Sequence, residues 1–448
     1  MAISGTTFTN WAGTERCTPA RIVRARTIPE VQEAVRRAAA DGLPVKAAGS
    51  GHSFTAAAMT DGVLVDISGL DRVLDIDRER RLVRVEAGIA IHALADALAS
   101  HGLAFENLGD IDRQSIAGAI ATGTHGTGGT LGNISSQVVG AELVDGRGEL
   151  VALDGVDDPD GLRAARVSLG ALGIVVAVTL RCVPAYVLRG VDTTAPLEEV
   201  LESVDQRVAD HRHFELYAFP HAPRALTRTN DVVDEPAAPP GRLEQWLRQG
   251  LLETYTLKAF CGAGKRVPRA IPRLNRAVTR LAGTSVRTDR SDRIFSSPRD
   301  VRFVEMEYAL PRAATVPALR EILATIDRRG FAVNFPIEVR FVAGDDALLS
   351  PARGRETGYL AVHMYRGMPW EPYFRAVEAI ANEHGGRPHW GKRHFQTAAT
   401  LAPRYPEFER FAAVRARLDP DGRFANAYTD QVLGPARPVG STAAAVAR

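Results

Sequence analysis

The chain has 448 residues, more than one ordinary hydrophobic core accommodates, so two domains are expected. Its charged residues (24%) and apolar residues (45%) are typical of a soluble globular protein, and a formal net charge of +2 argues against a dedicated nucleic-acid-binding protein. Three cysteines lie at unrelated spacings, no apolar run approaches the ~18 residues of a membrane span, and the N-terminus lacks the basic and apolar regions of a signal peptide. We therefore expect a cytoplasmic protein.

Residues 20–190 alternate short β-branched runs with helical stretches. Thr27-Ile-Pro-Glu30 is a capping box with proline in the first turn, which predicts a helix through about Ala40. A second helix is predicted at 91–100, with Gly102 as its C′ glycine. Strands are predicted at 63–67, 73–76 and 82–85.

The segment Val45-Lys-Ala-Ala-Gly-Ser-Gly-His-Ser-Phe54 predicts a short buried strand followed by a tight turn. Gly49 and Gly51 permit positive φ, and their backbone N–H groups can approach a ligand closely. Successive N–H groups in such a turn form a concave anion site that suits a diphosphate, with His52 beside it. The alternative is an ordinary turn that carries a solvated histidine.

Two further glycine-rich turns follow. Residues 115–128 form a long run of small and hydroxyl side chains around His125, interleaved with apolar residues that make a solvated surface loop an unsatisfactory explanation. Residues 168–176 form a turn that leads into an apolar β-branched run. Each turn is a weak signal alone, but three in one N-terminal region indicate a nucleotide cofactor.

The common nucleotide and metal motifs are absent from the sequence. Phe54 stands where the third glycine of G-x-G-x-x-G belongs, and Gly264-Lys265 lacks the other residues of a P-loop. There is no H-E-x-x-H, and the cysteines are too scattered for a zinc site, so no metal is expected.

Beyond Ala185 the chain changes to longer helical and strand units. A proline-rich break at 235–241 precedes a basic stretch at 242–283, which is either an irregular helical insertion with its leucines buried or a surface that contacts anionic lipid. Alternating strands are predicted at 305–311 and 335–342, with a helix at 315–329 between them. This pattern predicts a sheet with helices on one face, which would form a substrate domain.

Ala48-Gly-Ser-Gly-His-Ser-Phe54 and Ala121-Thr-Gly-Thr-His-Gly-Thr127 resemble the FAD domain of the vanillyl-alcohol-oxidase (PCMH-type) superfamily. Ile337-Glu-Val-Arg340 and Gly386-Arg-Pro-His-Trp-Gly-Lys392 narrow the resemblance to aldonolactone oxidoreductases and alditol oxidases, with L-gulono-1,4-lactone oxidases and dehydrogenases the most similar. The resemblance covers roughly residues 8–435.

The resemblance implies an α+β, two-domain PCMH-type FAD-binding fold with a substrate (cap) domain of antiparallel sheet and helices. The implied division is an FAD-binding domain at 1–188, a cap domain at 189–400, a segment at 401–435 that returns to the FAD domain, and a disordered tail at 436–448.

The resemblance also implies which residues contact FAD. In this superfamily the histidine matching His52 often bonds covalently to the flavin 8α-methyl, and the alternative is a noncovalent neighbour of the ring. The implied cofactor-binding residues are Ala48, Gly49, Ser50, Gly51, His52, Ser53, Ser115, Gly118, Thr122, Gly123, Thr124, His125, Gly126, Gly173 and Ile174.

The implied catalytic residues are Glu338, Arg340, Lys392 and His363. Glu338 and Arg340 stand at i and i+2 of a predicted strand, so both point to one face. There they would hold substrate hydroxyls and stabilise negative charge on oxygen, unless they form only a structural ion pair. A desolvated Lys392 would assist removal of the hydroxyl proton, unless it is a solvated lysine in a turn.

The implied reaction is FAD-dependent oxidation of an aldono-1,4-lactone at C2, giving an ascorbate-like product, with electrons passed to oxygen, cytochrome c or a quinone. An alditol or other carbohydrate oxidase is the alternative enzyme, and a flavin-binding storage or sensor protein is the alternative without catalysis. Ala119 occupies a position where alditol oxidases carry a substrate-contacting serine, which favours a lactone.

Overall fold

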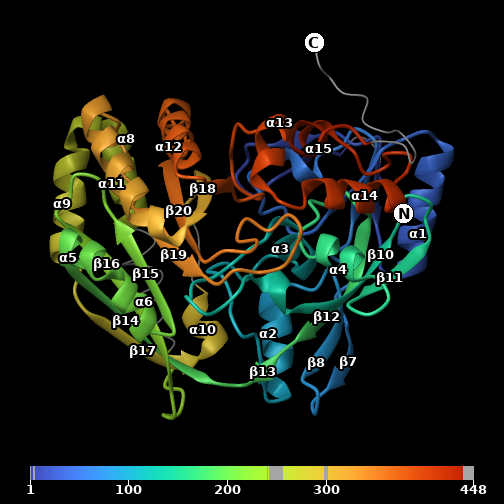
Figure 1. Cartoon of the computed structure of the whole chain (residues 1–448), viewed down its shortest axis with the longest axis horizontal. Helices are drawn as coiled ribbons and strands as arrows, with labels where there is room; N and C mark the ends of the chain where they lie inside the picture. Colours follow the sequence, from blue (N-terminus) through green and yellow to red (C-terminus); the bar gives the residue numbers. More distant parts are fainter. Residues whose placement is uncertain (1, 4–5, 240, 242–255, 297–300, 437–448) are drawn as a thin grey trace.

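The computed structural model describes residues 2–3, 6–239, 241, 256–296 and 301–436. Figure 1 shows two lobes side by side, with the N-terminal lobe on the right and the later cap lobe on the left. The tail predicted at 436–448 lies outside the described residues except for its first residue, and so does the 242–255 part of the basic stretch.

Two larger sheets form the described part of the N-terminal lobe. A four-stranded sheet has the order β1-β4-β6-β5, in which β6 pairs in parallel with both β4 and β5. Its strands are β1 (Ala2–Ile3), β4 (Arg21–Arg24), β6 (Val63–Asp66) and β5 (Val45–Ala48). An antiparallel five-stranded sheet consists of β11 (Leu150–Asp154), β10 (Val138–Val144), β12 (Ile174–Arg181), β8 (Leu82–Glu86) and β7 (Val73–Asp77).

Helix α1 (Ile28–Ala40) begins where the capping box predicts. The side chain of Thr27 accepts a hydrogen bond from the backbone N–H of Glu30, and Pro29 lies in the first turn. The Glu30 carboxylate, however, accepts from the backbone N–H of Arg26 rather than from that of Thr27, so the return bond of the box is displaced by one residue. The helix buries one apolar stripe, formed by Val31, Ala34, Val35 and Ala38.

The remaining short elements of this lobe connect the two sheets. Helix α2 ends before Gly102, whose φ of +73° is the left-handed conformation expected of a C′ glycine. The elements are α2 (Ile91–Ser100), α3 (Ile116–Thr122), α4 (Pro159–Ala165), the 3₁₀ turns η1 (Ala56–Ala58) and η2 (Ile134–Gln137), and the strand pairs β2 (Phe8–Thr9) with β3 (Arg16–Cys17) and β9 (Leu103–Ala104) with β13 (Val183–Pro184).

The cap lobe is built on one eight-stranded sheet in which every neighbouring pair is antiparallel. In sheet order the strands are β17 (Ser285–Arg290), β14 (Val187–Pro196), β16 (Arg224–Val233), β15 (His213–Ala218), β19 (Ile337–Val342), β20 (Thr357–Tyr365), β18 (Phe303–Pro311) and β21 (Arg387–Pro388). The strands predicted at 305–311 and 335–342 are therefore adjacent to β20 on either side.

Most helices of the lobe cover one face of this sheet, whereas Ile294 and Phe295 of one short helix pack into the N-terminal core. The predicted helix at 315–329 is present and extends three residues further toward the N-terminus, as α11. The helices of the lobe are α5 (Leu197–Glu202), α6 (Val204–Asp210), α8 (Thr256–Arg266), η4 (Pro268–Ala270), α9 (Ile271–Leu281), α10 (Ser291–Phe295), α11 (Arg312–Arg329) and α12 (Glu371–Glu383).

Strand alternation separates the two faces of the cap sheet. Met306, Tyr308 and Val339 belong to the core beneath the helices. Because successive side chains of a strand point to opposite faces, Glu305 and Glu338 point away from that core and toward the N-terminal lobe. Alternation thus delivers charged side chains to the junction between the lobes.

The last described segment returns to the N-terminal lobe, as Figure 1 shows for α13 (Ala398–Leu401), α14 (Phe408–Leu418) and α15 (Ala427–Leu433). The 3₁₀ turn η5 (Ala402–Arg404) lies between α13 and α14. Residues of this segment share one hydrophobic cluster with residues 25–188, and residues 197–381 form a second cluster. Residues 294–295, 347–349 and Trp390 also belong to the first cluster. The proposed division at 188 and 400 stays a prediction, and these residues cross it because the cap contributes loops to the N-terminal core.

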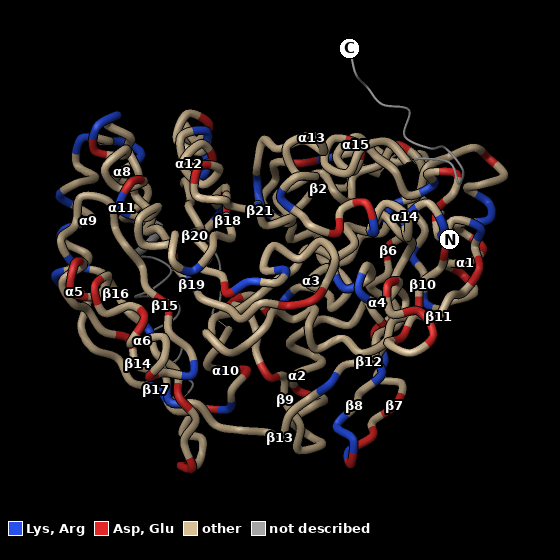
Figure 2. Tube along the Cα trace, in the orientation of Figure 1, with Lys and Arg blue, Asp and Glu red and all other residues tan. Residues whose placement is uncertain are grey.

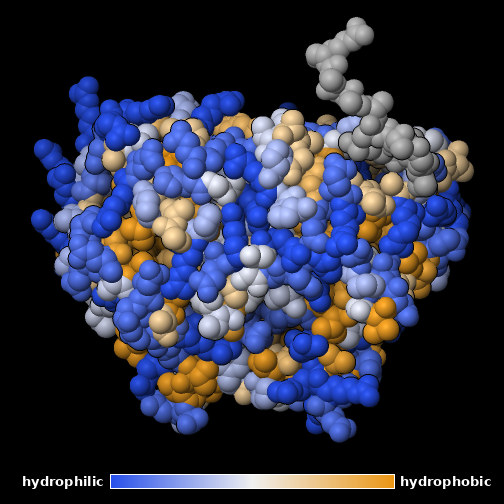
Figure 3. Space-filling model, viewed as in Figure 1, coloured by the Kyte–Doolittle hydropathy of each residue, from blue (hydrophilic) through white to orange (hydrophobic). Residues whose placement is uncertain are grey.

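The described part of the basic stretch exposes a row of cations on α8, η4 and α9, at the left edge of Figure 2. Lys265, Arg266, Arg269, Arg273, Arg276 and Arg280 are all exposed. Leu281 is 84% exposed, so the leucines of this insertion are not all buried. Contact with anionic lipid stays a prediction, and the face in Figure 3 is mostly hydrophilic with apolar residues in small separate patches. No helix within the described residues is both long and apolar enough to cross a membrane.

Candidate active site

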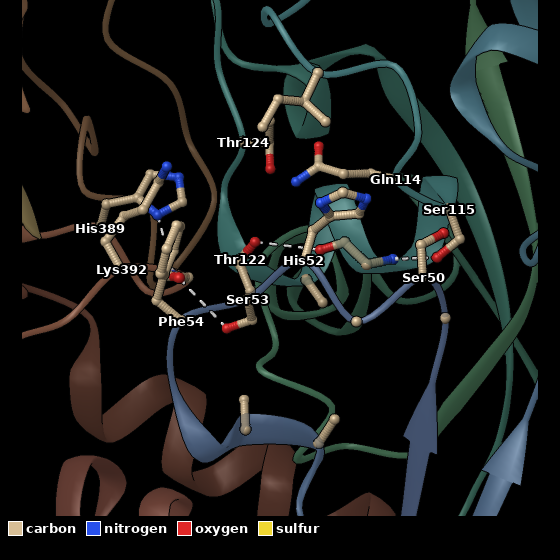
Figure 4. A pocket seen from close by; sticks show the side chains of 18 of the residues that line it. Ser50, His52, Ser53, Phe54, Gln114, Ser115, Thr122, Thr124, His389 and Lys392 are labelled. Atoms are coloured by element: carbon tan, nitrogen blue, oxygen red, sulfur yellow. Dashed lines mark hydrogen bonds between the residues drawn. The ribbon is translucent and has the colours of Figure 1, made fainter. Parts of the chain in front are cut away.

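A deep pocket lies between the two lobes and encloses about 1570 Å³ of space not filled by atoms, part of it open to solvent. One wall comes from the three glycine-rich turns of the N-terminal lobe, and the other comes from β18, β19, β20 and the segment 389–392. Figure 4 shows His52, Gln114 and Ser115 on one side, with His389 and Lys392 approaching from another segment. Turns far apart in sequence thus meet around a single extended space, which suits a dinucleotide.

The first two turns pack against each other without spare room. A Cβ added to Gly49 would lie 2.0 Å from Ser115 Oγ, and Ser115 in turn caps α3 by accepting a hydrogen bond from the backbone N–H of Gly118. Gly51 has a φ of +69°, in the left-handed region that favours glycine. The turns therefore present backbone rather than side chains to the pocket.

Most of the predicted cofactor-binding residues line this pocket, namely Ala48, Gly49, Ser50, Gly51, His52, Ser53, Ser115, Gly118, Thr122, Thr124, His125 and Gly173. Three do not line it, and their contact with the cofactor stays a prediction. Gly123 is the left-handed C-cap of α3, a Cβ on Gly126 would lie 2.1 Å from the Leu108 carbonyl oxygen, and Ile174 is 1% exposed in the core. These three residues lie behind the pocket surface, which is formed by their neighbours in the sequence.

His52 lies in the pocket with its imidazole stacked on Trp11 at 5.8 Å between ring centroids. Burial, reinforced by the positive charge of Lys392, lowers the pKa of His52 below 6.5. The ring is therefore neutral at pH 7, which is the form that has a nucleophilic lone pair.

The pocket also contains polar atoms without protein partners. Gln114 Oε1 and Thr124 Oγ1 are buried, line the pocket and have no hydrogen-bond partner within the described residues. Because a buried polar atom is normally satisfied, a polar ligand in the pocket would supply the partner that each atom lacks. Together with the glycine cradle, they fit the isoalloxazine and diphosphate of FAD.

Arg340 is the centre of a buried ionic network on the cap wall. Its Nε donates to Glu215 at 2.9 Å, and its Nη2 contacts both Glu338 and Asp110, the latter at 2.5 Å. Burial by itself lowers the pKa of Arg340, but these three carboxylates outweigh it and raise that pKa well above its usual value. Arg340 is thus a permanent cation, and Asp110 connects it to the N-terminal lobe.

Lys392 is held by Glu305, which accepts a hydrogen bond from its ammonium at 2.5 Å and lies 3.3 Å from His363 Nε2. Burial alone raises the pKa of Glu305, but Lys392 and His363 outweigh it and leave that pKa well below its usual value. The role of Lys392 as a proton acceptor stays a prediction. The Nζ atom of Lys392 also lies 5.2 Å from the centroid of the Phe54 ring.

A second buried acid, Glu307, stands two positions along β18. It lies 3.1 Å from His125 Nε2, while Nδ1 of the same ring donates to the Gly126 carbonyl. Burial raises the pKa of Glu307, but His125 outweighs it and lowers that pKa to about 2. Nearby, burial lowers the pKa of His389 to about 3, and its Nδ1 accepts from the Gly391 N–H.

Two sets of side chains have ligand atoms close enough to share a cation, His125–Glu307–His389 and Asp110–Glu215–Glu338. In the second set the Arg340 guanidinium already occupies the centre and supplies the positive charge. Neither set changes the expectation that the protein needs no metal, which stays a prediction.

The four predicted catalytic residues all line the pocket: Glu338, Arg340, Lys392 and His363. Ala119, used to favour a lactone, is fully buried in the core of the N-terminal lobe and does not line it, so that argument fails. Sequence reasoning missed Asp110, Glu305, Glu307, Gln114 and Trp11. Glu305 and Glu307 did leave a signal, since two acids at i and i+2 within an apolar strand share one face.

Comparison with known proteins agrees with this arrangement. A family model described as FAD binding domain matches residues 19–154, and one described as D-arabinono-1,4-lactone oxidase matches residues 178–432. An L-gulono-1,4-lactone dehydrogenase of Mycobacterium tuberculosis is 48% identical over 96% of this chain and 99% of its own. An L-gulonolactone oxidase of Bos taurus is 34% identical over 96% and 98%.

Among solved structures, cholesterol oxidase from B. sterolicum superposes with a TM-score of 0.82 over 97% of both chains. At 18% identity this match shows the fold alone, and it confirms the predicted PCMH-type, two-domain α+β architecture. The family model spans more than half of the chain and the relatives nearly all of it. The chain therefore belongs to the D-arabinono-1,4-lactone oxidase family of FAD-dependent oxidoreductases that act on CH–OH groups.

Proposed function

We propose that this protein oxidises the C2 hydroxyl of an aldono-1,4-lactone of the L-gulono-1,4-lactone type to a 2-keto lactone, which tautomerises to an ascorbate-like enediol. The observation that carries the proposal is the fixed pair of cations, Arg340 and Lys392, in the same pocket as His52 and the glycine turns. A protein that only stores or senses flavin needs no such buried charges. The 48% identical relative is named for this type of lactone.

FAD, when bound, supplies the acceptor for the hydride. The chain's own residues then act by position and charge. Arg340 and Lys392 stabilise negative charge that develops on the substrate oxygen, and both are held rigidly by buried carboxylates, so little reorganisation is required during reaction. Glu338 orients substrate hydroxyls beside Arg340.

His52 is the proposed site of a covalent bond to the flavin. Support comes from its place in the pocket and from its lowered pKa, because a neutral imidazole is the form that adds to an electrophilic flavin. Acid-precipitated protein is then expected to keep its flavin fluorescence, and His52→Ala is expected to release it. Flavin in the supernatant of the wild-type precipitate would reject the bond while leaving FAD binding intact.

The alternative substrate class is an alditol or another polyol, which His363 in the pocket wall favours because alditol oxidases have an active-site histidine at the matching position. Anaerobic bleaching of the flavin by a panel of substrates separates the two classes. L-gulono-1,4-lactone is expected to bleach faster than xylitol or sorbitol, and the opposite order would assign the protein to the alternative.

Oxygen, cytochrome c and a quinone are the proposed electron acceptors, and the cytoplasm is the proposed location. Mixing the anaerobically reduced protein with each acceptor and following the return of flavin absorbance distinguishes an oxidase from a dehydrogenase. Reoxidation by oxygen at a rate matching turnover would identify an oxidase.

A further inference from the structure

Lys46 is a buried lysine at the base of the first glycine turn. It lies on β5, is 1% exposed, and lines the pocket. Its Nζ donates to three backbone carbonyls, those of Leu169 at 3.5 Å, Gly170 at 3.2 Å and Phe424 at 3.1 Å. An ammonium group has three N–H donors, whereas a neutral amine has only two, so the three acceptors match the charged form.

Two of these carbonyls belong to a strained turn in the pocket wall. Leu169 and Gly170 have φ angles of +54° and +61°. The Ala171 N–H donates to the Ser168 carbonyl across them at 2.9 Å, which fits a type I′ turn. A leucine rarely adopts a positive φ, and such strain persists only where the surroundings over-determine the backbone. Since Ser168, Leu169 and Gly170 line the pocket, the strain lies at the surface that would contact the cofactor.

Hydrogen bonds fix this turn from two sides. The Leu169 N–H donates at 3.0 Å to the carbonyl of Ala121, which lies on α3 in the second glycine-rich segment. On the other side, the Leu169 carbonyl accepts from Lys46. The carbonyl and the N–H of one trans peptide group point in opposite directions, so this bond turns the Gly170 N–H away from Lys46. The described residues offer that N–H no acceptor, which leaves it available to a ligand.

The third carbonyl belongs to the C-terminal segment. Asp419 accepts hydrogen bonds from the backbone N–H groups of Arg423 and Phe424 at 2.7 and 2.9 Å. The Val45 N–H donates to the Arg423 carbonyl at 2.8 Å, so this segment lies against β5. Lys46 thus connects β5 to two segments that lie 124 and 378 positions further along the chain.

We propose that Lys46 is a positioning residue for FAD, whose ammonium group holds the strained turn at 168–171 in the conformation that binds the cofactor. This inference rests on the binding of FAD and not on the identity of the substrate. FAD brings a diphosphate into the same pocket, and its negative charge favours the ammonium form of a lysine nearby. Binding of FAD and protonation of Lys46 therefore reinforce each other.

The charges that face Lys46 are Arg415 on α14, Asp419 at the end of that helix, and Asp430 on α15. Burial, reinforced by Arg415, lowers the pKa of Lys46 to about 7, although Asp419 and Asp430 oppose this shift. Above that pH the protein without FAD loses one N–H donor, and one of the three carbonyls loses its partner. FAD-bound protein has the higher pKa, so it binds more protons, and FAD affinity is expected to weaken as the pH rises from 7.

FAD affinity measured against pH tests the proposal without any substrate. The measurement uses the His52→Ala chain, in which no covalent bond to the flavin can form at that residue. Quenching of flavin fluorescence is followed from about pH 6 to about pH 9, and proton uptake is followed when FAD is added near pH 8. We expect weaker binding at higher pH and uptake of protons. An affinity that does not change with pH would overturn the proposal, whereas failure to oxidise a lactone would count against the proposed function alone.

Lys46→Met keeps most of the side-chain length and removes the charge and all three donors. In the His52→Ala chain it is expected to weaken FAD binding at about pH 6 by at least about tenfold, because hydrogen bonds from a charged donor are among the strongest. It should also abolish the pH dependence. With His52 intact, Lys46→Met should be purified with less FAD per chain than the wild type.

Lys265→Met is the matched control. Lys265 also donates to a backbone carbonyl, that of Arg366 at 3.2 Å, but it is exposed on α8 of the cap lobe. This variant should keep the affinity and the pH dependence of the chain from which it is made. Equal losses of FAD in Lys46→Met and Lys265→Met would overturn the proposal.

Lys46→Arg separates the charge from the geometry. A guanidinium stays charged across this pH range but cannot direct three donors from one nitrogen, so FAD binding should be weaker than with lysine and independent of pH. Unfolding temperature without FAD is measured for every variant. A folded Lys46→Met chain with unchanged FAD affinity and pH dependence would reduce Lys46 to a structural contact. If Lys46→Met does not fold, the pH series on the chain that retains Lys46 still decides the matter.

Discussion

The two walls of the pocket are lined by different kinds of residue. The N-terminal wall consists largely of glycine, serine, threonine and backbone N–H groups, whereas the cap wall carries Glu305, Glu307, Glu338, Arg340 and His363 on three neighbouring strands. The first wall specifies shape and tolerates little added volume. The second specifies charge, and each of its ions is held by a counterion. Substitutions in the two walls are therefore expected to fail in different ways, by clash in one and by lost electrostatic stabilisation in the other.

The largest expected effect is on the charged wall. Lys392→Met removes a preorganised cation, which typically costs ~3–4 kcal/mol, or roughly 10²–10³ in rate. FAD should be retained, and anaerobic flavin reduction should slow by at least about a hundredfold. A near-wild-type rate of flavin reduction would indicate that Lys392 forms only a structural ion pair with Glu305.

Arg340→Ala should slow reduction as strongly, but it also removes a cation that contacts three buried carboxylates, so its unfolding temperature should fall as well. Glu338→Gln should weaken both substrate binding and turnover. As a control, Arg37→Ala removes an exposed i,i+4 ion pair with Glu33 and should change stability by no more than ~0.5 kcal/mol and leave flavin reduction unchanged.

The next effect is on the glycine wall. Gly126→Ala would place a Cβ 2.1 Å from the carbonyl oxygen of Leu108, a backbone atom that cannot rotate away. Overpacking of this kind costs about 1–3 kcal/mol, and the displaced turn should lose FAD. The measurement is the unfolding temperature together with the ratio of flavin to protein. Gly155→Ala is the matched control, because no atom lies within 4 Å of its added Cβ; equal behaviour of the two variants would contradict the steric account.

The smallest effect concerns acid stability. Burial lowers the pKa of His213 to about 4 and that of His389 to about 3, so both stay neutral in the fold below pH 6.5 while the unfolded chain takes up protons. The unfolded state then binds more protons, and stability falls as the pH decreases from 6.5. At pH 5.5 the loss should be about 1.4 kcal/mol per histidine. Thermal unfolding between pH 7.5 and 5 measures it, and His213→Leu should flatten the slope; an unchanged slope would mean that His213 is not a source of the loss.

Local signals predicted much of this molecule correctly. Thr27 and Pro29 mark the start of α1, Gly102 ends α2, and the alternation around Glu338 and Arg340 predicts a strand with both charges on one face. These features depend on residues within one turn or one strand pair of each other. Each of the motifs quoted for the family also contributes residues to the pocket.

The partners of those charges were not predictable. Asp110 lies 230 positions before Arg340, and nothing in the loop at 109–114 indicates that it crosses to the other lobe. The partner of Lys392 was missed for the same reason, since Glu305 comes from a strand 87 residues away. The residue pattern within one segment does not show which distant segment will supply the counterions for its charged side chains.

The sequence by itself determined the elements, the glycine turns that carry backbone rather than side chains, and the identity of the reactive groups, because these follow from backbone sterics and periodicity within short stretches. Only the tertiary structure decided their protonation and pairing. Bringing the cap sheet against the N-terminal lobe removes water from Arg340, Lys392 and their acids, and the charge state of each then depends on a few neighbours at about 3 Å. The strength of these interactions depends on desolvation and on short distances between charges. Both arise only when the two lobes pack together.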